Sequence, residues 1–211
     1  MRRPAAAEVA QELERVLAAV RREQLMLESS PDAPSVVELL TGERLKASWW
    51  THPGSETAMA VLFRLRDHAE VVRVPLLSRR ATWVHRELWP ELLAVATARE
   101  AWQLDGLSER ALALLALADR EGVVRTRDLD WQQWPRAGKS ARELEDRLLV
   151  KGGEEGNPRE GPYKVVTAWP VWLAQHGLDD DLPAAQMARN ELHRTVGRLN
   201  QAWGTKLRLS F

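Results

Sequence analysis

The stretch from Arg44 to Pro53 combines aromatic, basic and imidazole side chains more densely than the rest of the sequence. Two adjacent tryptophans offer flat faces on which a nucleobase can stack, and nearby cations can hold its phosphate. The residues that would do so are Arg44, Lys46, Trp49, Trp50 and His52. The alternative is a structured loop that the two tryptophans pin to the core, and the cost of leaving indoles in water favours it.

A second cluster of the same kind comes later in the chain and contains Trp83, His85, Arg86 and Trp89. A histidine beside aromatic faces can line a binding pocket. A single pocket shared by His52 and His85 would suit an enzyme that acts on a flipped base. The alternative is a histidine at the edge of the core, which is the commoner arrangement.

The signatures of common catalytic and metal sites are absent from the sequence. There is no cysteine, and the five histidines include no His-x-x-x-His pair. No phosphate-binding glycine loop, nucleophile elbow or kinase motif is found. We therefore expect no catalytic residue, no metal and no cofactor.

The clearest order of elements follows Leu107. A helix begins at Ser108 and ends near Gly122, and Val123 to Arg125 is a short extended piece. Thr126 is expected to cap a brief helix, and Ser140 a third helix over 141–149. Two strand-like pieces, 149–151 and 163–169, flank a Gly/Pro/Asn-rich tip and predict a hairpin.

This order over 107–172 resembles that of a winged helix-turn-helix module. The resemblance implies that the third helix enters the major groove of DNA and that the hairpin tip touches the backbone or minor groove. The implied reading face is Lys139, Ser140, Arg142, Glu143, Asp146 and Arg147, and the implied tip contacts are Asn157 and Arg159.

The charges of this module are mixed. Between Arg136 and Lys164 there are seven basic and six acidic residues, a net charge of +1. Carboxylates that face phosphate are repelled, so the module could instead bind protein or serve as a rigid scaffold.

The segment from Pro183 to Phe211 is more basic, with five arginines and lysines against Glu191. Arg194 and Arg198 lie one helical turn apart and could contact phosphate. The alternative is a solvated helix balanced by the acidic run Asp179 to Asp181.

Composition limits the possible classes of protein. The 211 residues are 45% hydrophobic and 28% charged, which is typical of a globular chain, and the net charge is zero. A neutral chain does not coat nucleic acid by charge alone. No apolar run of membrane-spanning length and no signal segment are found, so we expect a cytoplasmic protein without a membrane partner.

These patterns predict a mainly α fold. The expected parts are a helical domain (5–104), a winged-helix domain (105–172) and a basic C-terminal helix and tail (173–211). Within the first part, helices are expected over 5–28, 36–40 and 55–66, and from Thr82 to Val95. Three functions remain open: a DNA-associated protein without catalysis, a protein-interaction adaptor or homo-oligomer, and a nucleic-acid-processing enzyme.

Overall fold

The computed structural model describes residues 4–46, 48–157, 161–178 and 181–211. The chain forms two compact units. Unit 1 comprises Met1–Trp89 and Asn190–Leu209, and unit 2 comprises Pro90–Arg189 and Ser210–Phe211. The range 105–172 lies entirely in unit 2, whereas the range 173–211 is divided between both units.

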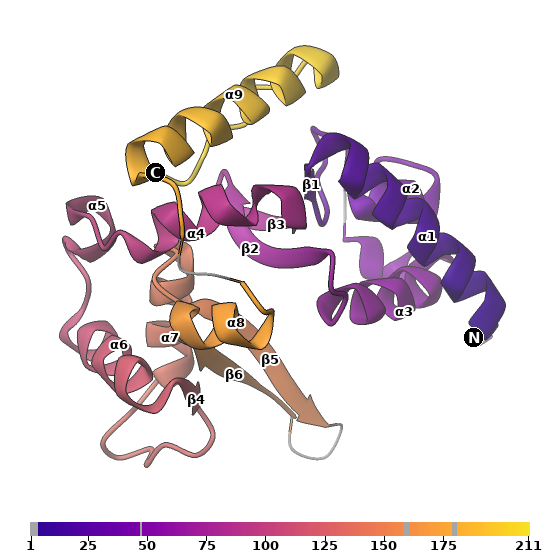
Figure 1. The fold of residues 1–211 in the computed structure, drawn as a ribbon. Helices are drawn as coiled ribbons and strands as arrows, with labels where there is room; N and C mark the ends of the chain where they lie inside the picture. The colour runs from indigo at the N-terminus through magenta and orange to yellow at the C-terminus, as the bar shows by residue number, and fades with distance from the viewer. Residues whose placement is uncertain (1–3, 47, 158–160, 179–180) are drawn as a thin grey trace. The chain divides into compact units, whose positions relative to one another are not determined.

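The expectation of a mainly α fold was wrong. About 52% of the chain is helical and 17% is in strands, and the strands form two three-stranded antiparallel sheets, one in each unit. The protein is therefore an α+β protein (Figure 1).

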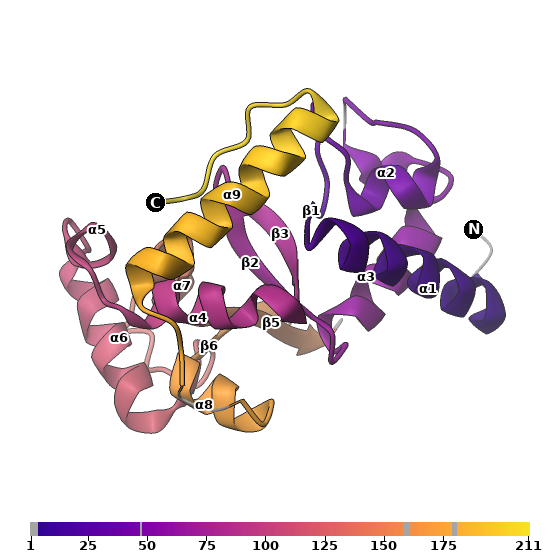
Figure 2. The same ribbon diagram turned by 45° about the horizontal axis from the view of Figure 1, so that its top comes forward.

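Up to residue 88, unit 1 packs the helices α1, α2 and α3 with a sheet of order β1-β3-β2. Its elements are α1 (Ala6–Glu23), β1 (Leu25–Leu27), α2 (Val36–Thr41), η1 (Trp49–Thr51), α3 (Ser55–Arg66), β2 (Val71–Leu77), β3 (Arg80–His85) and η2 (Arg86–Leu88). Apolar residues spaced by three and four give α1 one buried face, which includes Val9, Val16 and Val20. They share a core with Leu65 of α3 and Trp83 of β3. Figure 2 shows β2 and β3 side by side.

The helix predicted from Thr82 to Val95 is instead strand β3, then η2 and the start of α4 (Trp89–Thr97). The turn that joins β2 to β3 consists of Ser78 and Arg79, which have φ of 51° and 56°. A two-residue hairpin turn with two positive φ angles usually contains Asn or Gly, and neither is present here. Strand β2 contains Pro75, which is tolerated because β2 is an edge strand with an irregular register at this point. The last part of the helix expected over 5–28 is strand β1, because α1 ends at Gln24 in a left-handed conformation.

Unit 2 contains a hairpin where the sequence predicts one, but its first strand covers 151–157 instead of 149–151 and so extends into the segment expected to be the tip. Its elements are α5 (Ala101–Leu104), α6 (Glu109–Glu121), β4 (Val123–Arg125), α7 (Ala137–Asp146), β5 (Lys151–Asn157), β6 (Gly161–Thr167) and α8 (Trp169–Gln175). The sheet order is β4-β6-β5, and all pairs are antiparallel. Figure 1 shows the paired strands β5 and β6 below α7. Buried leucines of α6 and α7 form a core with Val124 and Val166 of this sheet.

The brief helix expected at Thr126 was also wrong, because residues 126–136 form turns. The Thr126 hydroxyl donates to the Lys164 carbonyl at 3.0 Å and accepts from the Lys164 backbone N–H at 3.1 Å. This side chain therefore extends the β4–β6 pairing and does not cap a helix.

The last helix is α9 (Ala185–Trp203), of which Ala185–Arg189 belongs to unit 2 and the rest to unit 1. Within the described residues, no helix combines the length and apolar character needed to span a membrane.

Candidate functional site

Helix α7 presents a row of cations to solvent. Ala137, Ser140, Ala141 and Leu144 are buried and define its core-facing side. Arg136, Lys139 and Arg142 are exposed and recur every three residues, so they lie along the other side of the helix. Among the described residues, no carboxylate lies within ion-pair distance of these three side chains. This row is called the α7 cation row below.

Two of the three acidic residues of α7, Glu143 and Glu145, are engaged inside unit 2, whereas the half-buried Asp146 has no ion-pair partner among the described residues. The two carboxylate oxygens of Glu143 accept hydrogen bonds from the Ser108 N–H and hydroxyl, both at 2.8 Å. Ser108 is also the N-cap of α6, because its hydroxyl accepts from the Ala111 N–H. Glu145 pairs with Lys164 of β6 at 3.3 Å. Of the carboxylates on α7, Asp146 is therefore the one that remains to repel phosphate.

The charges of the hairpin are also paired. Arg125 donates to both carboxylate oxygens of Glu155, and the Tyr163 hydroxyl donates to one of them at 2.8 Å. The Arg125 guanidinium, followed by the Tyr163 hydroxyl, lowers the pKa of Glu155. Partial burial, followed by the hydrogen bond to Glu155, raises the pKa of Tyr163. Arg127 lies over the Tyr163 ring at 4.4 Å.

The reading face implied by the sequence differs from the face that the structure exposes. Ser140 is buried, and Arg147 donates to the carbonyls of Trp102 and Asp105. Lys139 and Arg142 are exposed, as a reading face requires. Arg136 was missed, although its spacing from Lys139 and Arg142 was visible in the sequence.

The two residues predicted to contact DNA at the hairpin tip add no evidence for DNA binding. Arg159 lies outside the described residues, and Asn157 is described only through its backbone, which pairs with Gly161.

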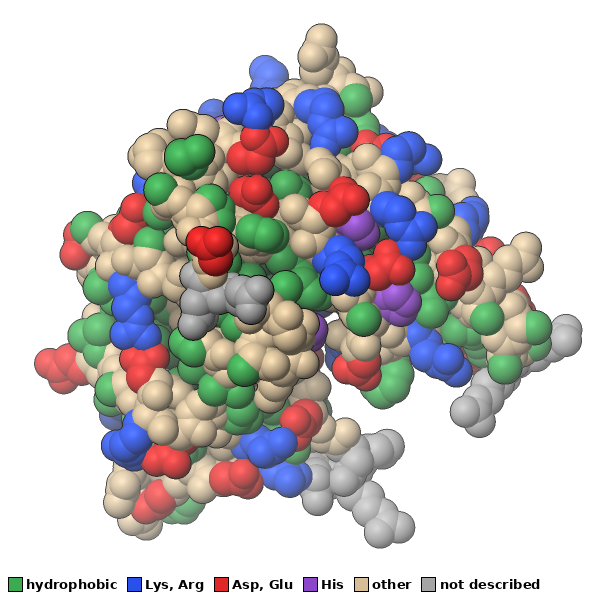
Figure 3. Space-filling model, viewed as in Figure 1, with side chains coloured by type: hydrophobic (Ala, Val, Ile, Leu, Met, Phe, Trp, Pro, Cys, Tyr) green, Lys and Arg blue, Asp and Glu red, His purple; other side chains and the backbone are tan. Residues whose placement is uncertain are grey.

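The C-terminal arginines belong to unit 1, whereas the α7 cation row belongs to unit 2. The two C-terminal arginines, Arg194 and Arg198, are exposed on α9. Arg194 pairs with Glu191, and Arg198 donates to the Gln24 side chain at 2.8 Å. Figure 3 shows basic and acidic side chains interspersed over the face that it draws.

In the loop before α3, Trp49 and Trp50 stack with ring centroids 4.3 Å apart. Trp49 packs against the core of unit 1, and Trp50 is 59% exposed. The polar residues of this loop are mostly paired, since Arg44 bonds to Glu38 and His52 to Glu43 at 3.0 Å. Lys46 is exposed.

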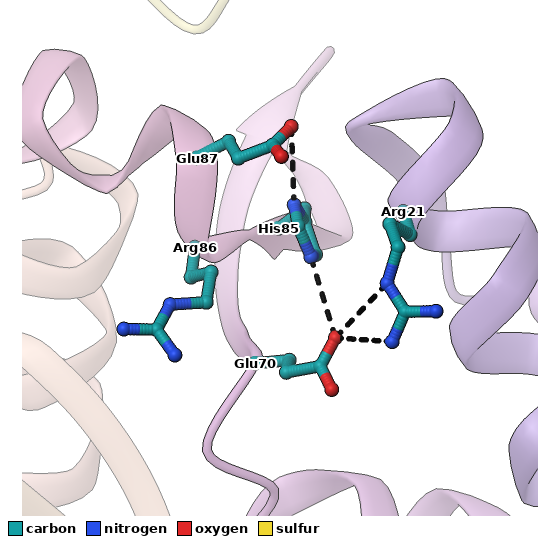
Figure 4. A pocket seen from close by; sticks show the side chains of 5 residues that line it. All are labelled: Arg21, Glu70, His85, Arg86 and Glu87. Carbon is teal, nitrogen blue, oxygen red and sulfur yellow. Dashed lines mark hydrogen bonds and ion pairs between the residues drawn. The ribbon is translucent and has the colours of Figure 1, made fainter.

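Unit 1 has a pocket of about 440 Å³ around His85 (Figure 4). Its lining residues are Arg21, Glu70, His85, Arg86 and Glu87. The end of α1 supplies Arg21, the residue before β2 supplies Glu70, and β3 with η2 supplies the other three. Of these, the sequence pointed to His85 and Arg86. Arg21 and Glu70 carried no local signal, because they come from distant segments, and Glu87 was missed although it lies two residues from His85.

His85 is almost fully buried, with 4% of its side chain exposed, between two carboxylates. Its Nε2 lies 3.5 Å from Glu70 and its Nδ1 lies 3.6 Å from Glu87, which is longer than a good hydrogen bond. A neutral imidazole has one donor and one acceptor nitrogen, so at most one contact could pair a donor with an acceptor. Both ring nitrogens of His85 are therefore buried without a good hydrogen-bond partner among the described residues.

Arg21 orders one side of this pocket, because it donates to Glu70 at 2.6 Å. This hydrogen bond lowers the pKa of Glu70. His52 does not line the pocket. In the part of the chain that the structure describes, no three acidic, histidine or cysteine side chains are arranged to hold a metal ion.

Comparison of the chain with known protein families, with curated proteins and with solved structures finds no match. Any functional assignment therefore depends on the geometry above.

Proposed function

We propose that unit 2 is a winged-helix module that binds duplex DNA through the α7 cation row, in the cytoplasm and without catalysis of its own. The observation that carries the proposal is that Arg136, Lys139 and Arg142 are exposed and have no carboxylate partner among the described residues, while Glu143 and Glu145 are bound within the unit. Phosphate binding depends on cations that are free to replace counterions, so the net charge of the segment matters less than which charges are free.

The arrangement of elements supports the same proposal. Unit 2 has the order first helix (α6), short strand (β4), turn region, second helix (α7) and hairpin (β5 and β6). Its first strand, β4, pairs with its last strand, β6. This order resembles that of a winged helix, in which the helix before the hairpin enters the major groove. Here that helix is α7.

The proposal is tested by the salt dependence of binding. Fluorescence anisotropy with a labelled blunt duplex would measure affinity at several salt concentrations for the native chain and for a Lys139→Ala/Arg142→Ala variant. Each lost phosphate contact lowers the slope of log K against log salt by about 0.9, so the variant is expected to lose about 2 units of slope.

The matched control is Arg110→Ala/Arg120→Ala, which removes two exposed arginines from α6 of the same unit. Its slope is expected to equal that of the native chain. Equal losses in the two variants would show binding by general charge and would refute a role for α7. Absence of duplex binding at low salt would refute the function itself.

A second candidate, a protein-interaction surface, is favoured by one feature of unit 1. Met59 and Phe63 lie one turn apart on α3 and are 48% and 67% exposed. Exposed apolar pairs of this kind occur at interfaces, here between two copies of the chain. Analytical ultracentrifugation of the native chain and of Phe63→Ser is the test, and a monomeric native chain at all concentrations would eliminate this candidate.

A further inference from the structure

Trp131 is the most exposed large hydrophobic side chain in the described part of the protein, at 75%. It belongs to the turn region between β4 and α7. It lies five positions before Arg136, where the α7 cation row begins. An indole in water is unfavourable unless a ligand covers it.

The backbone around Trp131 is fixed. Asp130 accepts two hydrogen bonds, one from the Gln132 N–H to its side chain at 2.9 Å and one from the Trp134 N–H to its carbonyl at 2.8 Å. Trp134 packs against the core of unit 2, and its carbonyl accepts from the Ala137 N–H at the start of α7. The turn that carries Trp131 is thus anchored at both ends and continues directly into α7.

The surroundings of Trp131 indicate what kind of ligand could cover it. Its neighbours Asp130, Gln132 and Gln133 are polar and exposed, so the indole is not part of a broad apolar patch. A protein partner usually requires a contiguous apolar area of several side chains, whereas a nucleobase needs a single aromatic face. The free cations that follow at Arg136 and Lys139 favour a polyanion.

We infer that Trp131 is a stacking site for an unpaired base of DNA whose duplex part is held by α7. The inference rests on the proposed function and extends it, because the preferred ligand becomes a duplex with a single-stranded extension. Bases inside a duplex are already stacked on each other, so only an unpaired base can cover the indole. Arg136 and Lys139 would contact the phosphates next to that base.

The test uses the full chain and two labelled probes, a blunt duplex and the same duplex with a short single-stranded overhang at either end. The native chain is expected to bind the overhang probe about tenfold more tightly, which is the usual size of one base–aromatic stack. Trp131→Ala is expected to remove this advantage and to leave blunt-duplex affinity unchanged. Trp131→Phe is expected to retain most of it.

The matched control is Met187→Ala, which removes another highly exposed apolar side chain from unit 2. It should behave like the native chain on both probes. Thermal melting of each variant checks that the fold is intact, which an exposed side chain should leave unchanged.

The outcomes separate this inference from the proposed function. If the duplex binds in a Lys139/Arg142-dependent manner but the overhang gives no gain, or Trp131→Ala keeps the gain, the stacking site is refuted and the function stands. If the overhang gain depends on Trp131 but the Lys139/Arg142 variant binds normally, the stacking site is supported and the role of α7 is refuted. If neither probe binds, both are refuted.

Discussion

Replacement of Glu143 by alanine tests the claim on which the α7 surface depends, namely that this carboxylate is engaged inside unit 2. Glu143 reaches from α7 to the first residues of α6 and bonds to the N–H and hydroxyl of Ser108, each at 2.8 Å. The substitution removes both contacts and a negative charge near the positive end of the α6 dipole. It is expected to lower stability and, by removing an acid beside Arg142, to strengthen DNA binding.

The expected loss of stability follows from the number of hydrogen bonds removed and from the exposure of the two residues. A hydrogen bond to a charged group contributes about 1.5–3 kcal/mol when buried, but Ser108 is exposed and Glu143 half-buried, so the two bonds together are expected to contribute about 1–2 kcal/mol. For a unit of this size, that corresponds to a decrease in Tm of roughly 5–10 °C. One charge about 10 Å from phosphate in water is worth about 0.4 kcal/mol, so DNA affinity should rise about twofold.

The assay is a double-mutant cycle of Glu143→Ala and Ser108→Ala, measured by urea unfolding. Ser108→Ala should itself cost about 1 kcal/mol as a lost N-cap. Both substitutions remove the bond from the Ser108 hydroxyl, whereas the backbone N–H of residue 108 still donates to Glu143 in Ser108→Ala. The double variant should therefore be more stable than additivity predicts by about 0.5–1 kcal/mol. Glu143→Gln, which can still bond to Ser108, should lie between the native chain and Glu143→Ala.

A coupling energy below about 0.3 kcal/mol would refute the reasoning, since independent sites add within that error. Glu143 would then be free in solution, its charge would oppose phosphate, and the argument for a cationic α7 surface would fail.

Two further predictions concern a buried hydrogen bond that stabilises unit 2 and an ion pair at the His85 pocket. Trp169→Phe removes the indole N–H that donates to the buried Leu148 carbonyl at 2.7 Å, so it should lower the free energy of unfolding by about 1–3 kcal/mol with an unchanged m-value in urea. The hydrogen bond from Arg21 lowers the pKa of Glu70 in the folded state. The stabilisation that this pair gives the fold is therefore complete above the ordinary glutamate pKa of about 4.3, and it is lost as pH falls through the lowered pKa. Between pH 6 and 2, the native chain should therefore lose more stability than Glu70→Gln; equal losses would contradict the ion pair.

The secondary structure was predictable where the signals are local. Helix α6 begins at an N-cap serine and ends at Gly122, whose φ is +77°, and a side chain there would meet Val171 at 2.8 Å. The Gly-rich hairpin of β5 and β6 was equally visible in the sequence. The strands of unit 1 were not, because their turn lacks glycine and their proline is acceptable only on an edge strand.

The candidate sites, like the secondary structure, were predictable only where the signal is local in the sequence. The sequence contained the cations of α7 and the histidine of the unit 1 pocket, but a count of charges between Arg136 and Lys164 gave almost neutrality. Only the fold shows that Glu143 and Glu145 have partners and that, in the part of the chain that the structure describes, Lys139 and Arg142 have none. Likewise, only the fold brings Arg21 and Glu70 to His85.

The sequence by itself determined the Ser108 cap of α6, the amphipathic faces and the presence of the hairpin, since these depend on residues within a few positions of one another. It did not determine where α7 begins, because Ser140, the expected cap, lies inside that helix. Tertiary structure alone decided which segments became strands of unit 1, which charges remained free, and which polar groups surround His85. The physical reason is that strand pairing and charge pairing are made between residues far apart in the chain, and their energies depend on distance in space.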